Sequence, residues 1–102
     1  MKRNVRWSEA ALADFERTFE HIARDSLENA RKVAERIGHS IDLLADMPFG
    51  RVGRVAGTFE ASVPKVPFIV AYSLPDDGSL GIVRIIHTSR HWPAGRWPGT
   101  GE

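Results

Sequence analysis

The second half of the chain contains side chains of the kinds that transfer protons and hold phosphate groups. Cleavage of a phosphodiester without a metal requires a base, an acid and cations that stabilise the charge developing on the phosphate. A histidine can supply the acid or the base near neutral pH, and arginines can supply the cations. The candidates for such a site are Arg51, Arg54, Glu60, Tyr72, Arg84, His87 and Arg90.

His87 and Tyr72 are the candidates for proton transfer, and each has a structural alternative. His87 is expected at the end of a strand, where it either acts as acid or base or hydrogen-bonds a nearby backbone group. Tyr72 is in phase with Phe68 and Val70, which favours a core ring with its hydroxyl at the surface over a catalytic phenol. For both residues we favour the structural role.

Arg84 lies between two apolar residues of a strand that reads as largely buried. A buried guanidinium must be paired, and Glu60 is the obvious partner, so we predict a structural Glu60–Arg84 ion pair. The alternative is that Arg84, His87 and Arg90 converge with the loop around residues 51–54 and form a catalytic cluster.

Arg51 and Arg54 lie in a predicted loop, and together with Arg90 and Trp92 they are the best candidates for contacts with a macromolecular target. Arginine and tryptophan are the side chains on which binding energy concentrates, and a tryptophan can alternatively pack on the sheet or stack on a base. Lys65 is the only lysine from Arg51 to Arg90. That is few cations for a nuclease, so the composition favours binding.

A short strand and two helices are expected ahead of these side chains. Residues 3–7 alternate polar and apolar, as in a short strand. Ser8 and Ser26 are suited to cap two amphipathic helices, and Pro48 and Gly50 end the second, which predicts an antiparallel helical hairpin. The expected inward-facing residues are Leu12, Phe15, Phe19 and Ile22 in the first helix and Ala30, Val33, Ile37, Ile41 and Leu44 in the second.

Beyond residue 51 the apolar period changes from that of a helix to that of a strand. We predict strands at 55–63, with Phe59, Ala61 and Val63 on one face, at 68–74, and at 79–87, with a turn at 75–78. The last strand is apolar on both faces and is therefore expected to be central. The fold class is α+β: an N-terminal strand, an antiparallel helical hairpin and a three-stranded antiparallel sheet (β-α-α-β-β-β).

Composition limits the kind of protein. The 102 residues fit one domain, and the absence of cysteine excludes disulfides and cysteine–zinc sites. The 14 Lys and Arg nearly balance the 13 Asp and Glu, so the chain is not expected to bind specific DNA sequences itself. We predict no metal and no cofactor. With neither a signal peptide nor an apolar run of membrane-spanning length, the expected location is the cytoplasm.

Four segments of the chain match known sequence patterns. The segment 50–60 (GRVGRVAGTFE) is similar to a "GR-x-GRV-x-GTRE" pattern, and 67–72 (PFIVAY) to a "PYIVAY" strand. The segment 85–93 (IIHTSRHWP) resembles a "VLH-x-x-R-x-WP" ending, and 7–15 a "W-x-x-A-x-x-DL" start. In this order the four segments resemble the RelE/ParE superfamily of toxins from type II toxin–antitoxin systems. Phe59 departs from the pattern, which has a basic residue there. The tail also extends about nine residues beyond the usual Trp-Pro end.

The resemblance implies a toxin domain over 1–93, followed by a C-terminal tail at 94–102. It implies neutralisation by a cognate antitoxin that wraps a segment around the toxin. It also implies one of two targets. The RelE branch cleaves messenger RNA on the ribosome with a cluster of Lys and Arg plus a Tyr or His, for which the candidates are His87, Arg84, Arg54 and Tyr72. The ParE branch binds DNA gyrase, for which the candidates are Arg51, Arg54, Arg90 and Trp92. The scarcity of cations favours the ParE-like branch, and a degenerate toxin that retains only antitoxin binding is a third possibility.

Overall fold

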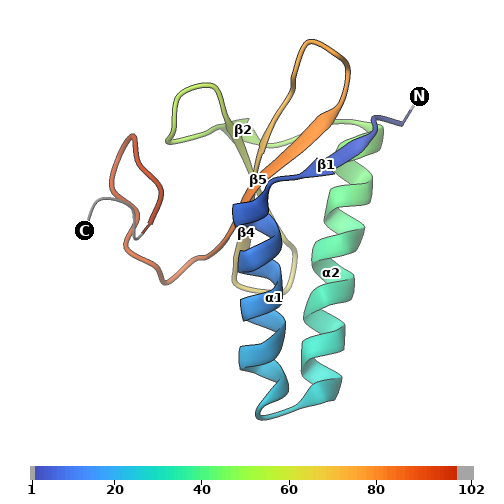
Figure 1. Cartoon of the computed structure of the whole chain (residues 1–102), viewed down its shortest axis with the longest axis vertical. Helices are drawn as coiled ribbons and strands as arrows, with labels where there is room; N and C mark the ends of the chain where they lie inside the picture. Colours follow the sequence, from blue (N-terminus) through green and yellow to red (C-terminus); the bar gives the residue numbers. More distant parts are fainter. Residues whose placement is uncertain (1, 99–102) are drawn as a thin grey trace.

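The computed structural model describes residues 2–98 and consists of a helical hairpin packed on one face of a five-stranded sheet (Figure 1). The helices are α1 (Glu9–Ala23) and α2 (Leu27–Asp46). The strands are β1 (Val5–Trp7), β2 (Arg51–Val52), β3 (Phe59–Ser62), β4 (Phe68–Ser73) and β5 (Leu80–His87). The α+β class and the hairpin are as predicted.

The two predicted caps start the helices. The Ser8 side chain accepts a hydrogen bond from the Ala11 backbone N–H, and the Ser26 side chain accepts one from the Asn29 N–H. Each bond satisfies one of the N–H groups that a helix leaves unpaired at its start. Leu12 was expected to face inward but is 44% exposed, because the inward stripe of α1 runs through Ala11 instead.

The sheet order is β1-β5-β4-β3-β2, so β5 lies inside the sheet between β1 and β4, as its two apolar faces predicted, although β4 is the middle strand. The predicted three-stranded antiparallel sheet is formed by β3, β4 and β5, and β1 extends it into a mixed sheet by pairing with β5 in parallel, from Val5 opposite Leu80 to Trp7 opposite Ile82. Three residues with an alternating pattern reveal a strand but not its neighbour. The neighbour and direction depend on where the helical hairpin and β5 are placed.

The strand predicted at 55–63 is shorter than expected, because residues 53–58 form a turn. The Gly53 N–H donates to the Thr58 carbonyl at 2.8 Å, and the Thr58 hydroxyl donates to the Val55 carbonyl at 2.7 Å. Gly57, at φ 81°, allows the chain to reverse there. The turn creates an additional edge strand, β2, which pairs with β3. Two residues are too few to show a period.

The apolar core lies between the helices and one face of the sheet. Phe59, Ala61 and Val63 contribute to it as predicted, and Tyr72 lies beside Phe59, with the rings stacked at 5.6 Å. β5 has a β-bulge opposite Ala71 and Tyr72, and Val83 is its extra residue. Ile82 and Ile85 therefore both face the helices although they are three residues apart.

The opposite face of the sheet is also partly apolar. Ile69, Ala71 and Ile86 are buried but do not belong to the helix-facing cluster. In the view of Figure 1 the C-terminal segment lies at the left, away from α2 at the right. No helix among residues 2–98 combines the length and apolarity needed to cross a bilayer.

Candidate functional site

Glu60 organises the arginine-rich loop between β2 and β3. Its carboxylate is 1% exposed. It accepts hydrogen bonds from the Arg51 guanidinium at 3.1 Å and from the Arg54 backbone N–H at 2.7 Å. The Arg54 Nε lies 3.6 Å from the same carboxylate. A buried carboxylate with three such neighbours is compensated, so both arginines are positioned by one acidic side chain.

The predicted ion pair between Glu60 and Arg84 is therefore wrong. Glu60 lies opposite Ala71, and Ala71 lies opposite Arg84, so the two residues share a face but are separated by a whole strand. Strands are about 4.8 Å apart, which places the two backbones roughly twice that distance apart. Each charge is compensated by a nearer partner.

Two glycines allow the loop to lie against the carboxylate. A Cβ at Gly50, where φ is 120°, would come within 2.4 Å of the Glu60 carbonyl oxygen. A Cβ at Gly53 would come within 2.5 Å of the Thr58 hydroxyl. Both approaches exclude any side chain, so the Gly-Arg-x-Gly-Arg spacing places two guanidinium groups around one buried acid.

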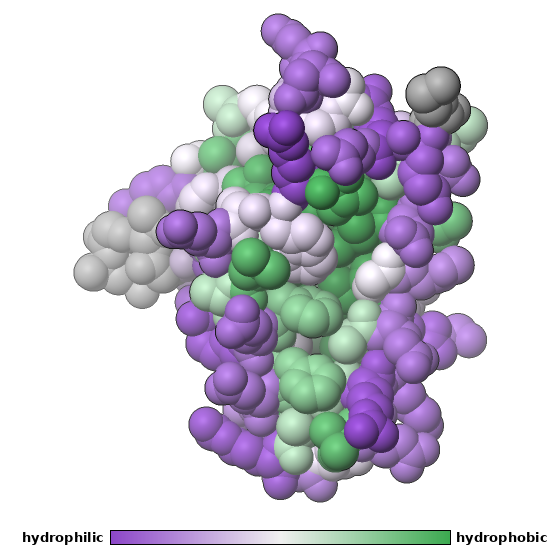
Figure 2. All heavy atoms as spheres, turned by 45° about the vertical axis from the view of Figure 1, so that its right-hand side comes forward, coloured by the Kyte–Doolittle hydropathy of each residue, from purple (hydrophilic) through white to green (hydrophobic). Residues whose placement is uncertain are grey.

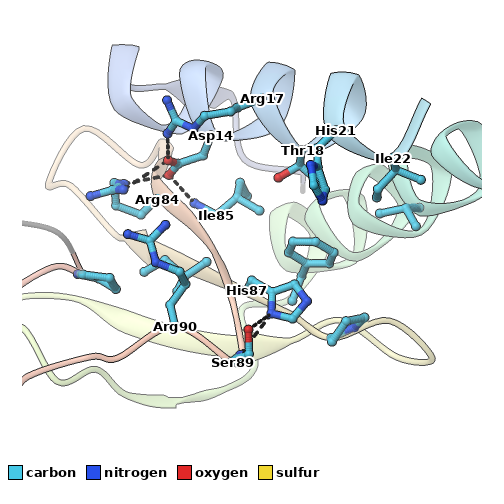
Figure 3. A pocket seen from close by; sticks show the side chains of 15 residues that line it. Asp14, Arg17, Thr18, His21, Ile22, Arg84, Ile85, His87, Ser89 and Arg90 are labelled. Atoms are coloured by element: carbon cyan, nitrogen blue, oxygen red, sulfur yellow. Dashed lines mark hydrogen bonds and ion pairs between the residues drawn. The ribbon is translucent and has the colours of Figure 1, made fainter. Parts of the chain in front are cut away.

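Asp14 is the partner of Arg84 and was missed by the sequence analysis. Its Oδ2 lies 2.6 Å from Arg84 Nε and 3.0 Å from the Ile85 backbone nitrogen, and its Oδ1 lies 3.1 Å from Arg84 Nη2 (Figure 3). Arg17 also donates to Oδ1 at 2.9 Å. A signal was available: Asp14 lies three residues after the buried Ala11, so it occupies an inward position of α1.

His87 lies at the end of β5 with its ring on the helix-facing side of the sheet. The ring packs edge-on against Phe68 at 5.0 Å. Its Nδ1 accepts a hydrogen bond from the Ser89 backbone N–H at 3.0 Å, and the Ser89 hydroxyl lies 2.7 Å from the same atom. A ring nitrogen that accepts from an N–H is unprotonated. The bond matches the structural role that we favoured for this histidine.

A groove of about 630 Å³ lies between α1 and the second half of β5. Arg84, His87 and Arg90 line it, together with residues of α1 such as Arg17 and His21 (Figure 3). Its lining does not include the arginines of the β2–β3 loop. The positions of these side chains therefore do not support the alternative, in which the loop and the end of β5 form one catalytic cluster.

The Arg54 side chain instead stacks on the C-terminal segment. Its guanidinium lies 4.1 Å from the centre of the Trp92 ring, within the range of a cation–π contact. The Gly95 N–H donates to the Arg54 carbonyl at 3.1 Å, and Trp97 lies against Trp92 with 5.9 Å between the ring centres. Arg54 and Trp92 thus form one composite surface held by Glu60 on one side and Trp97 on the other.

The Tyr72 ring is in the core, as its phase with Phe68 and Val70 predicted, but its hydroxyl is not at the surface, because the residue is 2% exposed. Its hydroxyl donates a hydrogen bond to the Phe49 carbonyl. Burial raises the pKa of the Tyr72 phenol above its ordinary value of 10.0. The phenol is therefore protonated at neutral pH and engaged with the backbone, which disfavours a role as a base.

The titration of Tyr72 can be observed directly because it is the one tyrosine in the chain. We expect phenolate absorbance in the near ultraviolet to rise with a midpoint above the ordinary pKa of 10.0. A phenol whose folded pKa is raised stabilises the fold below the unfolded pKa, and this contribution is lost as pH rises through the folded pKa. Titration in 6 M guanidinium chloride is the control and should give the ordinary midpoint. A native midpoint at or below that of the unfolded chain would contradict the burial argument.

No group of three or more His, Cys, Asp or Glu side chains among residues 2–98 is arranged to hold a metal ion.

The turn before β5 is held by hydrogen bonds of its own residues. Asp77 accepts from the Ser79 N–H in the turn before β5, and the Ser79 hydroxyl together with this N–H lowers the pKa of the Asp77 carboxyl. The predicted turn at 75–78 is closed by a bond from the Gly78 N–H to the Pro75 carbonyl at 3.1 Å.

Comparison with known proteins identifies relatives along nearly the whole described chain. Residues 5–92 match the family model described as "ParE toxin of type II toxin-antitoxin system, parDE". Protein Y4kP of Sinorhizobium fredii, whose name proposes a toxin, is 31% identical over 93 residues, which cover 90% of this chain and 95% of that protein. A solved structure titled "Chromosomal ParDE TA system from P. aeruginosa" has the same fold, with a TM-score of 0.77 at 21% identity. The match covers 86% of this chain and 98% of that chain.

Proposed function

The chain belongs to the ParE toxin family of type II toxin–antitoxin systems, and we propose that it stops growth by binding DNA gyrase in the cytoplasm. The observation that carries this proposal is the Arg54–Trp92 surface, a stacked arginine and tryptophan braced by Glu60. Such side chains dominate the energy of protein interfaces. Arg51, three residues before Arg54, and Arg90, two residues before Trp92, supply further exposed cations. In this proposal the toxin is not an enzyme and requires no cofactor.

The arrangement of the other candidates disfavours ribonuclease chemistry. His87 is bonded to Ser89, Tyr72 to the Phe49 carbonyl, and Arg84 to Asp14. A metal-independent nuclease needs an acid, a base and cations around one phosphate. Here the cations are divided between the groove and the β2–β3 loop.

Pulsed expression without antitoxin tests the proposal. Gyrase binding predicts loss of viability with induction of the DNA-damage response and filamentation, and inhibition of supercoiling by the purified toxin. A RelE-like ribonuclease would instead cause rapid loss of messenger RNA and arrest of translation. Unimpaired growth at full expression would mean that the chain is a degenerate toxin.

We also propose that a cognate antitoxin neutralises the toxin by laying an amphipathic helix on the exposed apolar surface of the hairpin. Figure 2 shows an apolar band over this side of the molecule, bordered by hydrophilic residues. Leu43 of α2 and Met47, the C-cap that follows the helix, are 46% and 75% exposed. They offer apolar side chains at the end of the hairpin, which an amphipathic partner helix can contact through residues spaced i, i+3, i+4 and i+7.

Met47→Asp should weaken the antitoxin complex by at least about tenfold, because it places a charge in an apolar contact. The fold should be unaffected, since the side chain is largely exposed. The measurement is affinity for the product of the adjacent antitoxin reading frame, by calorimetry. Lys32→Asp, on the same helix, is the charge-change control. Equal affinity of the Met47→Asp variant and wild type would place the antitoxin helix elsewhere.

A further inference from the structure

The loop between β2 and β3 and the C-terminal segment form one surface, which we call the loop–tail surface and define as residues 51–58 and 90–98. The Gly95 N–H donates to the Arg54 carbonyl, and the Arg54 guanidinium lies over the Trp92 ring. Both segments lie on the same side of the molecule in Figure 1, away from α2. The two segments are therefore presented to a partner together.

The loop–tail surface carries positive charge without exposed negative charge of its own. Its two segments contain no Asp or Glu, and Glu60, the carboxylate beneath the loop, is 1% exposed. The exposed arginines of the two segments are Arg51, Arg54, Arg90 and Arg96. The helices mix both signs and hold most of the 13 acidic side chains. The near-zero charge of the whole chain thus conceals a surface of one sign, which attracts a polyanion.

A column of planar groups crosses this surface. The ring centres of Trp97 and Trp92 are 5.9 Å apart, and the Arg54 guanidinium lies 4.1 Å from the centre of the Trp92 ring. The Arg54 side chain is 42% exposed, so part of the guanidinium is free to contact another planar group. Nucleic-acid bases stack on guanidinium and indole planes of this kind.

We propose that the loop–tail surface binds single-stranded DNA without regard to sequence. Phosphates would lie along Arg51, Arg90 and Arg96, and an unpaired base would stack on the column that Arg54 and Trp92 form. The inference rests on the proposed function, because gyrase acts on DNA and therefore brings DNA to the toxin that binds it.

Single-stranded DNA fits this surface better than an acidic protein segment or a duplex. Carboxylates of a protein would satisfy the arginines but would supply no planar group to the column. The bases of a duplex are already paired and stacked on each other, so a duplex would offer the arginines its phosphates and leave the column unused. Only an unpaired strand uses both the charge and the planar groups.

The first experiment measures binding of an oligothymidylate of about 20 nucleotides to the purified full-length toxin, through quenching of tryptophan fluorescence. The single strand should bind at least about fivefold more tightly than a duplex of the same length, because only its bases can stack. The logarithm of the binding constant should fall with the logarithm of the salt concentration with a slope of about −2, since three phosphate contacts contribute about 0.7 each.

Substitution of single arginines separates this site from general charge attraction. Arg90→Gln and Arg96→Gln should each weaken binding at least about threefold and reduce the salt slope by about 0.7. Arg31→Gln removes an exposed arginine of α2 outside the loop–tail surface and should change neither quantity. Arg54→Lys keeps the charge but lacks the planar group, so it should reduce the quenching and leave the salt slope unchanged. Melting temperatures equal to that of wild type verify folding, and the two tail variants test the site independently of the bonds to Glu60.

Three results would overturn the inference. The duplex could bind as tightly as the single strand, Arg31→Gln could weaken binding as much as Arg96→Gln, or an oligouridylate could bind at least about tenfold more tightly than the oligothymidylate, which would make RNA the ligand. A toxin that inhibits supercoiling but does not bind the oligothymidylate would refute the DNA contact alone. A toxin that binds the oligothymidylate but leaves gyrase fully active would refute the proposed function and support the DNA contact.

Discussion

Asp14→Ala is expected to lower the free energy of unfolding by about 3–5 kcal/mol, the cost of leaving a buried charge without its partner. The change removes both bonds to Arg84, whose side chain is 16% exposed, and the acceptor of the Ile85 N–H. For a domain of this size each kcal/mol corresponds to about 4–8 °C in Tm. The melting temperature should therefore fall by more than about 10 °C.

Arg84→Ala should cost less, about 1.5–3 kcal/mol, a typical value for hydrogen bonds to a charged group. Asp14 would retain Arg17 and the Ile85 N–H as donors, whereas Arg84 has no such reserve among the bonds of the described residues. Chemical unfolding of both variants and the double variant, as a cycle, measures their coupling. Glu28→Ala, which breaks the exposed pair with Lys32, is the control and should cost less than about 1 kcal/mol. An Asp14→Ala variant as stable as this control would contradict the buried network.

Arg54→Ala and Trp92→Ala should each weaken inhibition of gyrase supercoiling at least about 30-fold, the effect of losing roughly 2 kcal/mol at the centre of an interface. Either substitution also leaves the remaining side chain without its stacking partner, because the guanidinium and the indole are stacked on each other. Truncation after Pro93 removes Trp97 and the Gly95–Arg54 bond and should weaken inhibition as well. His87→Ala should retain potency within about threefold of wild type, because His87 is bonded to Ser89 and is not part of the stacked surface.

The comparison uses purified variants in a supercoiling assay, with folding verified by antitoxin co-purification. Arg31→Ala, on the exposed side of α2, controls for general loss of positive charge. The same variants are scored for viability and for integrity of a reporter messenger. Cleavage of ribosome-bound message at defined sites by wild type, abolished in His87→Ala, would overturn the binding mechanism.

Local pattern was sufficient for both helices and for four of the five strands of this protein. The helix starts followed from Ser8 and Ser26, whose side chains can cap a helix without tertiary help, and the inward stripe of α2 followed from its period. The apolar faces of β5 indicated a central strand, and the order of motifs indicated the family. The turn at 53–58 was hidden because Val55, Ala56 and Thr58 also suit a strand, and β2 was too short to show a period.

The pairing of charges was decided by the tertiary structure alone. Glu60 and Arg84 carry opposite charges at strand positions that the sequence indicates are buried, yet β4 separates them in the sheet. The hairpin brings Asp14 to Arg84 across 70 residues of sequence, while a turn six residues long brings Arg54 to Glu60. An ion pair depends on distances of a few ångströms between side chains. The periodicity of a sequence determines which face of an element a residue occupies, but only the packing of elements determines which charges meet.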